Sequence, residues 1–277
     1  MGYRFSARNA VFASGIIGGV GISLARRIDD DTVKIGAIVI FLALAVASWV
    51  YLYVDWRRGK RVARFAAWQE PPWQYSDVLT GYEDRFQTYP FGMGKERHNV
   101  RAAMGVATGG WIGFVFEHVS KRWGGRYANE QLHGITLLEL PEVLPDVILL
   151  PNDSIESAKV LAGARKQNFE LYEFNKAWRA TGPDAKFVHD FVHPRMIETV
   201  LALEGPPKPI IMSQGAMYTF SAQPPKPEQI AIDFANLAAV AHQIPYVVWL
   251  DRGQGPKEVG RDYYAEWHRA MLEARGK

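Results

Sequence analysis

The chain has 277 residues, of which 48% are hydrophobic and 22% are charged. This composition is ordinary for a protein with a packed core and argues against an intrinsically disordered chain. The absence of cysteine excludes disulfides, zinc–thiolate sites and cysteine nucleophiles.

The net charge of +3 is divided unevenly along the chain. Residues 1–64 carry ten Lys and Arg against four Asp, a net charge of +6, whereas the remainder carries 22 basic against 25 acidic residues, a net charge of −3. A nucleic-acid-binding domain would carry its basic excess on the folded part. Here the excess flanks apolar segments, so we expect anionic lipid head groups as partners and no nucleic acid.

The apolar run of residues 33–54 predicts a transmembrane helix. It reads VKIGAIVIFLALAVASWVYLYV, and its single charge is Lys34 at the edge. These 22 residues would span ~33 Å as a helix, which matches a hydrocarbon core of about 30 Å. Trp49, Tyr51 and Tyr53 near its C-terminal end are typical of an interfacial aromatic belt.

Residues 9–25 form a second apolar segment, loosened by glycines. We expect it to span the membrane as well, so that residues 1–64 form a helical-hairpin anchor. A re-entrant or interfacial segment and a signal peptide remain alternatives, although a further span so close behind disfavours a signal peptide. The glycines are Gly15, Gly18, Gly19 and Gly21.

The positive charges predict the orientation of this anchor. Arg4 and Arg8 precede the first span, and a basic cluster follows the second. Basic residues favour the cytoplasmic side, so we expect both termini in the cytoplasm and a plasma (inner) membrane protein with two spans. We expect the cluster to contact the membrane surface, although a purely topological role as a stop-transfer flank remains open. The cluster comprises Arg57, Arg58, Lys60, Arg61 and Arg64.

Residues 70–277 are expected to form a cytosolic α+β domain that begins at Pro71-Pro72. Its first half has short apolar runs between Gly and Pro breaks, which predict a mostly antiparallel sheet. The second half changes to helical periodicity, with C-terminal helices. The predicted strands are 100–108, 111–118, 134–140, 146–150 and one or two within 169–181, followed by a hairpin over 210–222 turning at Gln214-Gly215. The predicted helices begin at Asp184 and Pro194 and cover 230–241 and 259–271, with 245–250 extended between the last two.

Several motifs in this half are similar to a known group of proteins. They are Glu173-Phe174-Asn175, Pro183-Asp184, His193-Pro194-Arg195-Met196 and Ile244-Pro245 with Trp249. With them, residues 70–250 resemble a family of membrane-anchored bacterial proteins, common in actinobacteria, that carry a domain of unknown function. The resemblance implies an N-terminal anchor and a cytosolic domain, and it transfers no activity.

One pair of residues could carry chemistry. His189 and His193 are four residues apart, a spacing that places two imidazoles on one helix face and can hold zinc. Asp190 stands where a zinc protease has Glu, and Pro194 disturbs the required helix. Glu117-His118 or His133 could supply a third ligand only if the fold brings them close.

Two other fragments fall short of known motifs. Residues 92–96, GMGKE, lack the first glycine and the Ser or Thr of a phosphate-binding loop, and Ile211 stands where a nucleophile elbow needs glycine. We therefore expect no cofactor.

Two functional hypotheses follow. The first is a membrane-tethered cytosolic interaction or regulatory domain without catalysis, with a protein partner or self-association. The alternative is a membrane-tethered metal-dependent hydrolase that uses His189 and His193.

Overall fold

A computed structural model describes residues 31–94, 96–107, 110–124, 127–152, 167–245 and 248–249. The chain divides into two compact units, Met1–Lys60 and Arg61–Lys277. The predicted span over residues 9–25 and the predicted helix over 259–271 lie outside the described residues.

The described part of the first unit is one long helix, α2 (Asp31–Gly59). Large apolar side chains are exposed along it, from Ile35 (63% exposed) to Tyr51 (71%). Near its end the Arg57 guanidinium lies 4.9 Å from the centroid of the Tyr53 ring. Within the described residues, no helix combines the length and apolarity that crossing a membrane requires.

The second unit begins with α3 (Arg61–Trp68), which belongs to the folded core. Val62, Phe65 and Ala66 on one face of α3 are buried. The Phe65 ring packs edge-on against Trp73 at 5.2 Å and stacks on Phe234 at 6.1 Å. The basic flank at Arg61 and Arg64 is therefore part of the domain rather than a linker.

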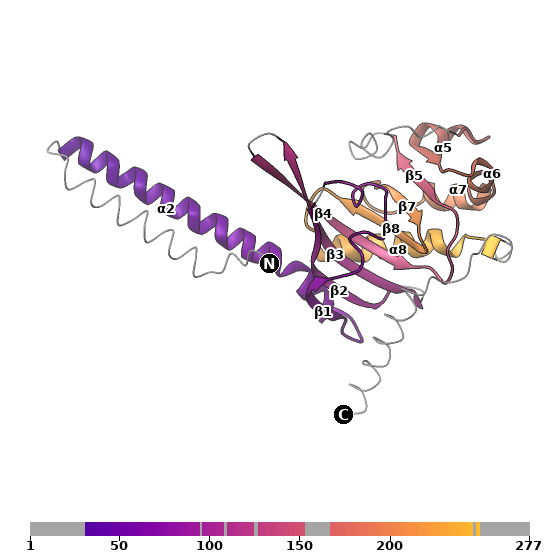
Figure 1. The fold of residues 1–277 in the computed structure, drawn as a ribbon, viewed down its shortest axis with the longest axis horizontal. Helices are drawn as coiled ribbons and strands as arrows, with labels where there is room; N and C mark the ends of the chain where they lie inside the picture. Colours follow the sequence, from indigo (N-terminus) through magenta and orange to yellow (C-terminus); the bar gives the residue numbers. More distant parts are fainter. Residues whose placement is uncertain are drawn as a thin grey trace, which may run out of the picture. The chain divides into compact units, whose positions relative to one another are not determined.

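The second unit is built on one eight-stranded antiparallel sheet (Figure 1). The strand order is β1-β2-β3-β4-β8-β7-β5-β6, so the hairpin β7–β8 inserts between β4 and β5. The strands are β1 (Gln74–Leu79), β2 (Glu96–Val106), β3 (Ile112–Gly124), β4 (Tyr127–Glu139), β5 (Val147–Pro151), β6 (Trp178–Thr181), β7 (Ile210–Ser213) and β8 (Ala216–Ser221).

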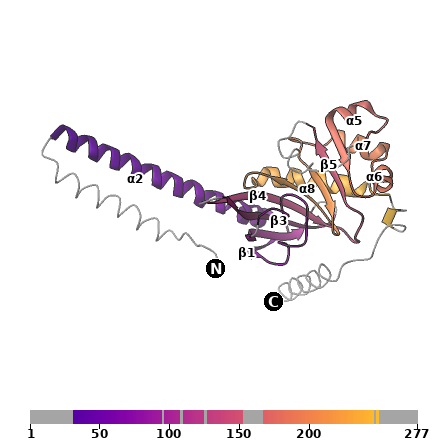
Figure 2. The ribbon, with the colours of Figure 1, turned by 45° about the horizontal axis from the view of Figure 1, so that its top comes forward.

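Helices cover one face of this sheet. α8 (Pro227–His242) lies along β4 and β8, while α5 (Tyr172–Ala177), α6 (Ala185–Phe191) and α7 (Pro194–Leu201) gather at the β5–β6 end (Figures 1 and 2). Buried residues of α3, α6, α7 and α8 form a single core with this face. The result is an α+β fold in which three short helices stand together at one end of the sheet.

The other face is covered by the segment between β1 and β2. Tyr82, Phe86 and Phe91 of this segment pack with strand residues into a second, aromatic core. Arg85 attaches the segment, because its guanidinium contacts Glu139 and donates to the Gln214 carbonyl at 3.0 Å. Gln214 and Gly215 both have positive φ, 52° and 74°, as expected of a tight hairpin turn.

Most predicted elements of the domain are confirmed, namely the four strands before residue 151, the helices at Asp184 and Pro194, the hairpin and the helix over 230–241. One prediction was right in part and another was wrong. Of the one or two strands expected within 169–181, β6 is present, whereas residues 172–177 form helix α5. Val248 is in a helical turn, its amide donating to the Pro245 carbonyl at 2.9 Å, where an extended segment was expected. The edge strand β1 was missed, because most of its side chains are exposed and lack an apolar alternation.

Candidate binding groove

Two capping residues position the helices that frame the candidate site. The Asp184 carboxylate accepts a hydrogen bond from the Phe187 amide at 2.9 Å, which satisfies an otherwise free N–H in the first turn of α6. His193 caps α7 in the same way, since its Nδ1 accepts from the Met196 amide at 3.4 Å. Pro194 fits the first turn of α7, where a missing N–H costs nothing. The turn between α6 and α7 is therefore fixed locally.

The segment before α5 is held by a side-chain amide. Asn175 accepts from the Phe169 amide at 3.0 Å, and its own amide donates to the Phe169 and Leu171 carbonyls. These bonds close residues 169–175 into a compact loop and helical turn. Glu170 and Leu171 are left exposed at its surface.

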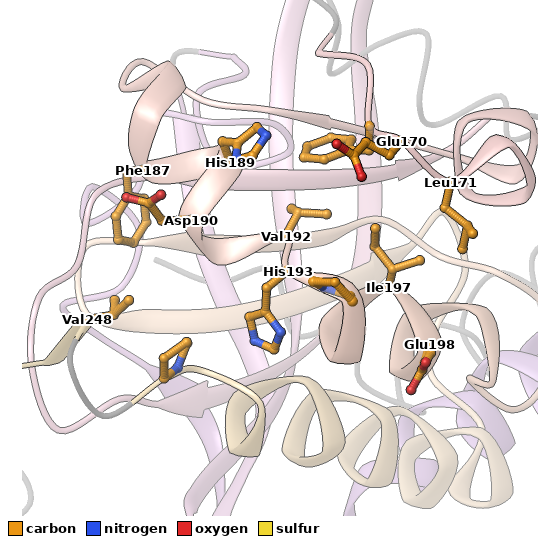
Figure 3. Close-up of a pocket in the computed structure, with 13 residues that line it drawn as sticks. Glu170, Leu171, Phe187, His189, Asp190, Val192, His193, Ile197, Glu198 and Val248 are labelled. Atoms are coloured by element: carbon orange, nitrogen blue, oxygen red, sulfur yellow. The ribbon is translucent and has the colours of Figure 1, made fainter.

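A partly open groove of about 700 Å³ lies between these elements (Figure 3). Its base is packed, since Phe187, Val192 and Ile197 are at most 5% exposed. Leu171, by contrast, is 41% exposed. The volume falls in the range of ligand-binding pockets. The lining residues are Phe169, Glu170, Leu171, Phe187, His189, Asp190, Val192, His193, Pro194, Ile197, Glu198, Pro245 and Val248.

The charged residues that line the groove are all acidic. Glu170, Asp190 and Glu198 are exposed, come from three different segments and stand around the apolar base in Figure 3. Neither Lys nor Arg is among the lining residues. The groove therefore combines an apolar base with a negatively charged rim.

The two histidines singled out from the sequence both line the groove, but their rings point in different directions (Figure 3). His189 is exposed and lies over Phe169, with ring centroids 5.9 Å apart. The His193 Nε2 lies 2.9 Å from the Gln243 carbonyl. With Nδ1 accepting from Met196, Nε2 carries the proton and donates to that carbonyl, so the ring has no lone pair left for a metal.

No family model matches the chain, and no curated protein sequence matches it. A solved structure does. The fold is similar to the crystal structure of the mycobacterial trehalose monomycolate transport factor A, TtfA. The TM-score is 0.51 at 10% sequence identity, and the match covers 68% of this chain and 96% of that chain. At this identity the likeness to TtfA shows a shared fold.

The remaining residues singled out from the sequence lie elsewhere in this TtfA-like fold. Glu117, His118 and His133 are buried within β3 and β4 and do not line the groove. Within the described ranges, no group of three or more His, Asp or Glu is arranged to hold a metal ion. The Gly92–Gly94 fragment lies in the segment over the second core, and Lys95 lies outside the described residues.

The basic cluster is largely solvent-accessible. Arg57, Lys60 and Arg64 are exposed, and the Arg61 guanidinium donates to the Pro224 carbonyl at 3.4 Å. The Arg58 side chain lies outside the described residues. Contact of this cluster with lipid stays a prediction.

The sequence did not reveal Glu170, Leu171, Ile197 or Glu198 as site residues. The one usable signal was the stretch HDFVHPRMIE at 189–198, in which an acidic residue near each end flanks apolar residues. Its partners at 169–171 and 245–248 are too distant in the chain for a local pattern to connect them.

Proposed function

We propose that this protein is a membrane-tethered cytosolic domain that acts without catalysis, by holding an apolar segment of a protein partner in the α5–α6–α7 groove. The observation that supports this most is the groove itself, with its exposed Leu171 above a packed apolar base. An exposed apolar depression rimmed by polar groups is a common form of protein-interaction site.

The tether in this proposal is α2. Many of its large apolar side chains are exposed, and leaving each Val, Leu or Ile in water forgoes about 1.5–3 kcal/mol of burial free energy. A bilayer would take up this surface. The proposed span covers residues 33–54, in which Lys34 at the edge is the only charged residue.

The cytosolic side is proposed from the basic cluster, which extends from the end of α2 into α3. A reporter enzyme that is active only outside the cytoplasm, fused after Lys277, should be inactive in cells. The same reporter inserted between the two apolar segments, at residues 26–30, should be active if residues 9–25 also span. Activity of the fusion after Lys277 would place the domain on the other side and remove this part of the proposal.

The proposed setting is transport at the membrane. The similar fold belongs to a protein described as a transport factor, and a non-catalytic domain that docks on a membrane protein suits such a role. The hydrolase alternative gains no support from the groove, because both His193 ring nitrogens are engaged.

Photo-crosslinking tests the proposed role. A benzophenone amino acid placed at Leu171 should crosslink the protein to one partner protein in native membranes. The same group at Val78, which is 55% exposed on the edge strand β1, is the matched control and should not. Absence of a product from position 171, or identical products from both positions, would contradict a groove-specific interaction.

A further inference from the structure

The rim of the groove carries three acidic residues, and they indicate the charge of its ligand. Glu170 precedes α5, Asp190 lies in the last turn of α6, and Glu198 lies in α7. None of the three carboxylates has a hydrogen bond or ion pair with another residue of the described ranges. All three acids are exposed and no lining residue is Lys or Arg, so the rim favours a ligand that brings positive charge.

We infer that the groove binds a basic amphipathic helix of the partner protein; this inference rests on the proposed function and specifies its ligand. The apolar face of such a helix would lie over Leu171 and Pro194, both exposed. Its Lys or Arg side chains would extend their aliphatic stems along the groove and place their charges at the rim. Recognition of an amphipathic helix by an apolar groove is a recurring mode of binding.

The negative charges of the rim also disfavour acidic and neutral ligands. An acidic peptide or an anionic phospholipid head group would meet three like charges. A neutral acyl chain would fit the apolar base but would gain nothing from the carboxylates. The acids therefore favour a cationic ligand, and a neutral lipid becomes an outcome that the experiment can detect.

The test uses full-length protein in phosphatidylcholine nanodiscs, which carry no net charge, and three synthetic helical peptides. The peptides share one leucine face and differ on the polar face, which carries Lys, Gln or Glu. The Lys peptide should bind about tenfold more tightly than the Gln peptide, and the Glu peptide most weakly. Because exposed charges are screened over ~8 Å at physiological ionic strength, the advantage of the Lys peptide should shrink as salt rises.

Charge-neutral variants test whether the rim carboxylates cause the preference for the Lys peptide. The triple variant Glu170→Gln, Asp190→Asn, Glu198→Gln should bind the Lys and Gln peptides equally. The matched control Glu130→Gln, Glu204→Gln, Glu228→Gln removes three exposed acids away from the groove and should bind like the original protein.

Three results would overturn the inference. They are equal binding of all three peptides, no binding of any, and retained preference for the Lys peptide in the rim variant. If a neutral fluorescent acyl chain binds and the Lys peptide fails to displace it, the groove is a lipid site. A partner crosslinked from position 171 together with any of these results would leave the proposed function standing and remove only its basic helical ligand.

Discussion

At the scale of single residues, the domain contains a buried carboxylate whose ion pair depends on a bulge in β2. The Glu117 side chain is fully buried in β3, and its carboxylate is contacted by the Arg101 guanidinium, which is 32% exposed. Arg101 has a φ of 52°, and the β2–β3 register shifts between Val100 and Ala103. A bulge re-aims a side chain at the expense of regular pairing, and here it directs Arg101 to Glu117.

Removal of Arg101 should therefore be costly. Arg101→Met leaves the Glu117 carboxylate buried without its cation, which should reduce the free energy of unfolding by about 3 kcal/mol. The double variant Arg101→Met, Glu117→Leu should recover most of this loss. Urea unfolding of the full chain in detergent, followed by near-UV circular dichroism, measures both.

The control for this pair is Lys121→Met, which breaks the more exposed ion pair of Lys121 with Glu96 at 3.5 Å. It should cost less than about 1 kcal/mol. A loss at Arg101 no larger than that at Lys121 would show that the buried pair is unimportant for stability.

A second residue-scale prediction concerns pH. Burial, with smaller contributions from His133, Arg97 and His98, lowers the pKa of His118 to about 3. Below its ordinary pKa of about 6.5, the unfolded chain binds a proton at His118 that the folded chain does not bind until about pH 3. Stability is therefore lost as pH falls through this window, by up to about 1.4 kcal/mol per pH unit from this residue.

The variant His118→Gln isolates that contribution. Its free energy of unfolding should fall less steeply between pH 6 and pH 4 than that of the original chain, whatever its stability at neutral pH. Parallel pH profiles for the two proteins would show that His118 takes up its proton in the folded state as readily as in the unfolded state.

At the scale of elements, the sequence predicted helix starts and turns reliably where a residue type strongly favours one such position. Asp184, Pro194 and Gln214-Gly215 predicted two helix starts and a turn, and each is confirmed. Helix α5 was missed because Asn175 holds it through bonds to Phe169, and such a contact leaves no apolar periodicity. The groove was missed because its walls come from segments that only the fold brings together.

The cap of α6 provides an element-scale prediction. Asp184→Ala removes the acceptor for the Phe187 amide and should cost about 1 kcal/mol of stability. Since α6 carries Asp190 of the groove rim, binding of the Lys peptide should also weaken.

The matched variant for this cap is Asp190→Ala in the same helix. Its carboxylate lies in the last turn, where a negative charge is unfavourable, so its loss should leave stability unchanged or slightly raised. Equal destabilisation by both substitutions would contradict the assigned cap.

At the scale of the whole molecule, the sequence has a basic N-terminal part with apolar segments and a mildly acidic remainder, and the structure divides into two compact units, Met1–Lys60 and Arg61–Lys277. The domain has an α+β fold similar to that of TtfA, and its acidic groove lies at the β5–β6 end of the sheet. We propose that α2 keeps the domain at the membrane and that the groove selects the partner that the domain binds there.

Co-purification from native membranes in mild detergent tests whether the groove holds a protein partner. The original chain and the control variant Val78→Lys should each retain one protein partner in stoichiometric amount. Leu171→Lys, which places a positive charge in the groove without disturbing the buried base, should lose at least about nine-tenths of it. A partner retained equally by Leu171→Lys, or no stoichiometric partner with the original chain, would contradict the account.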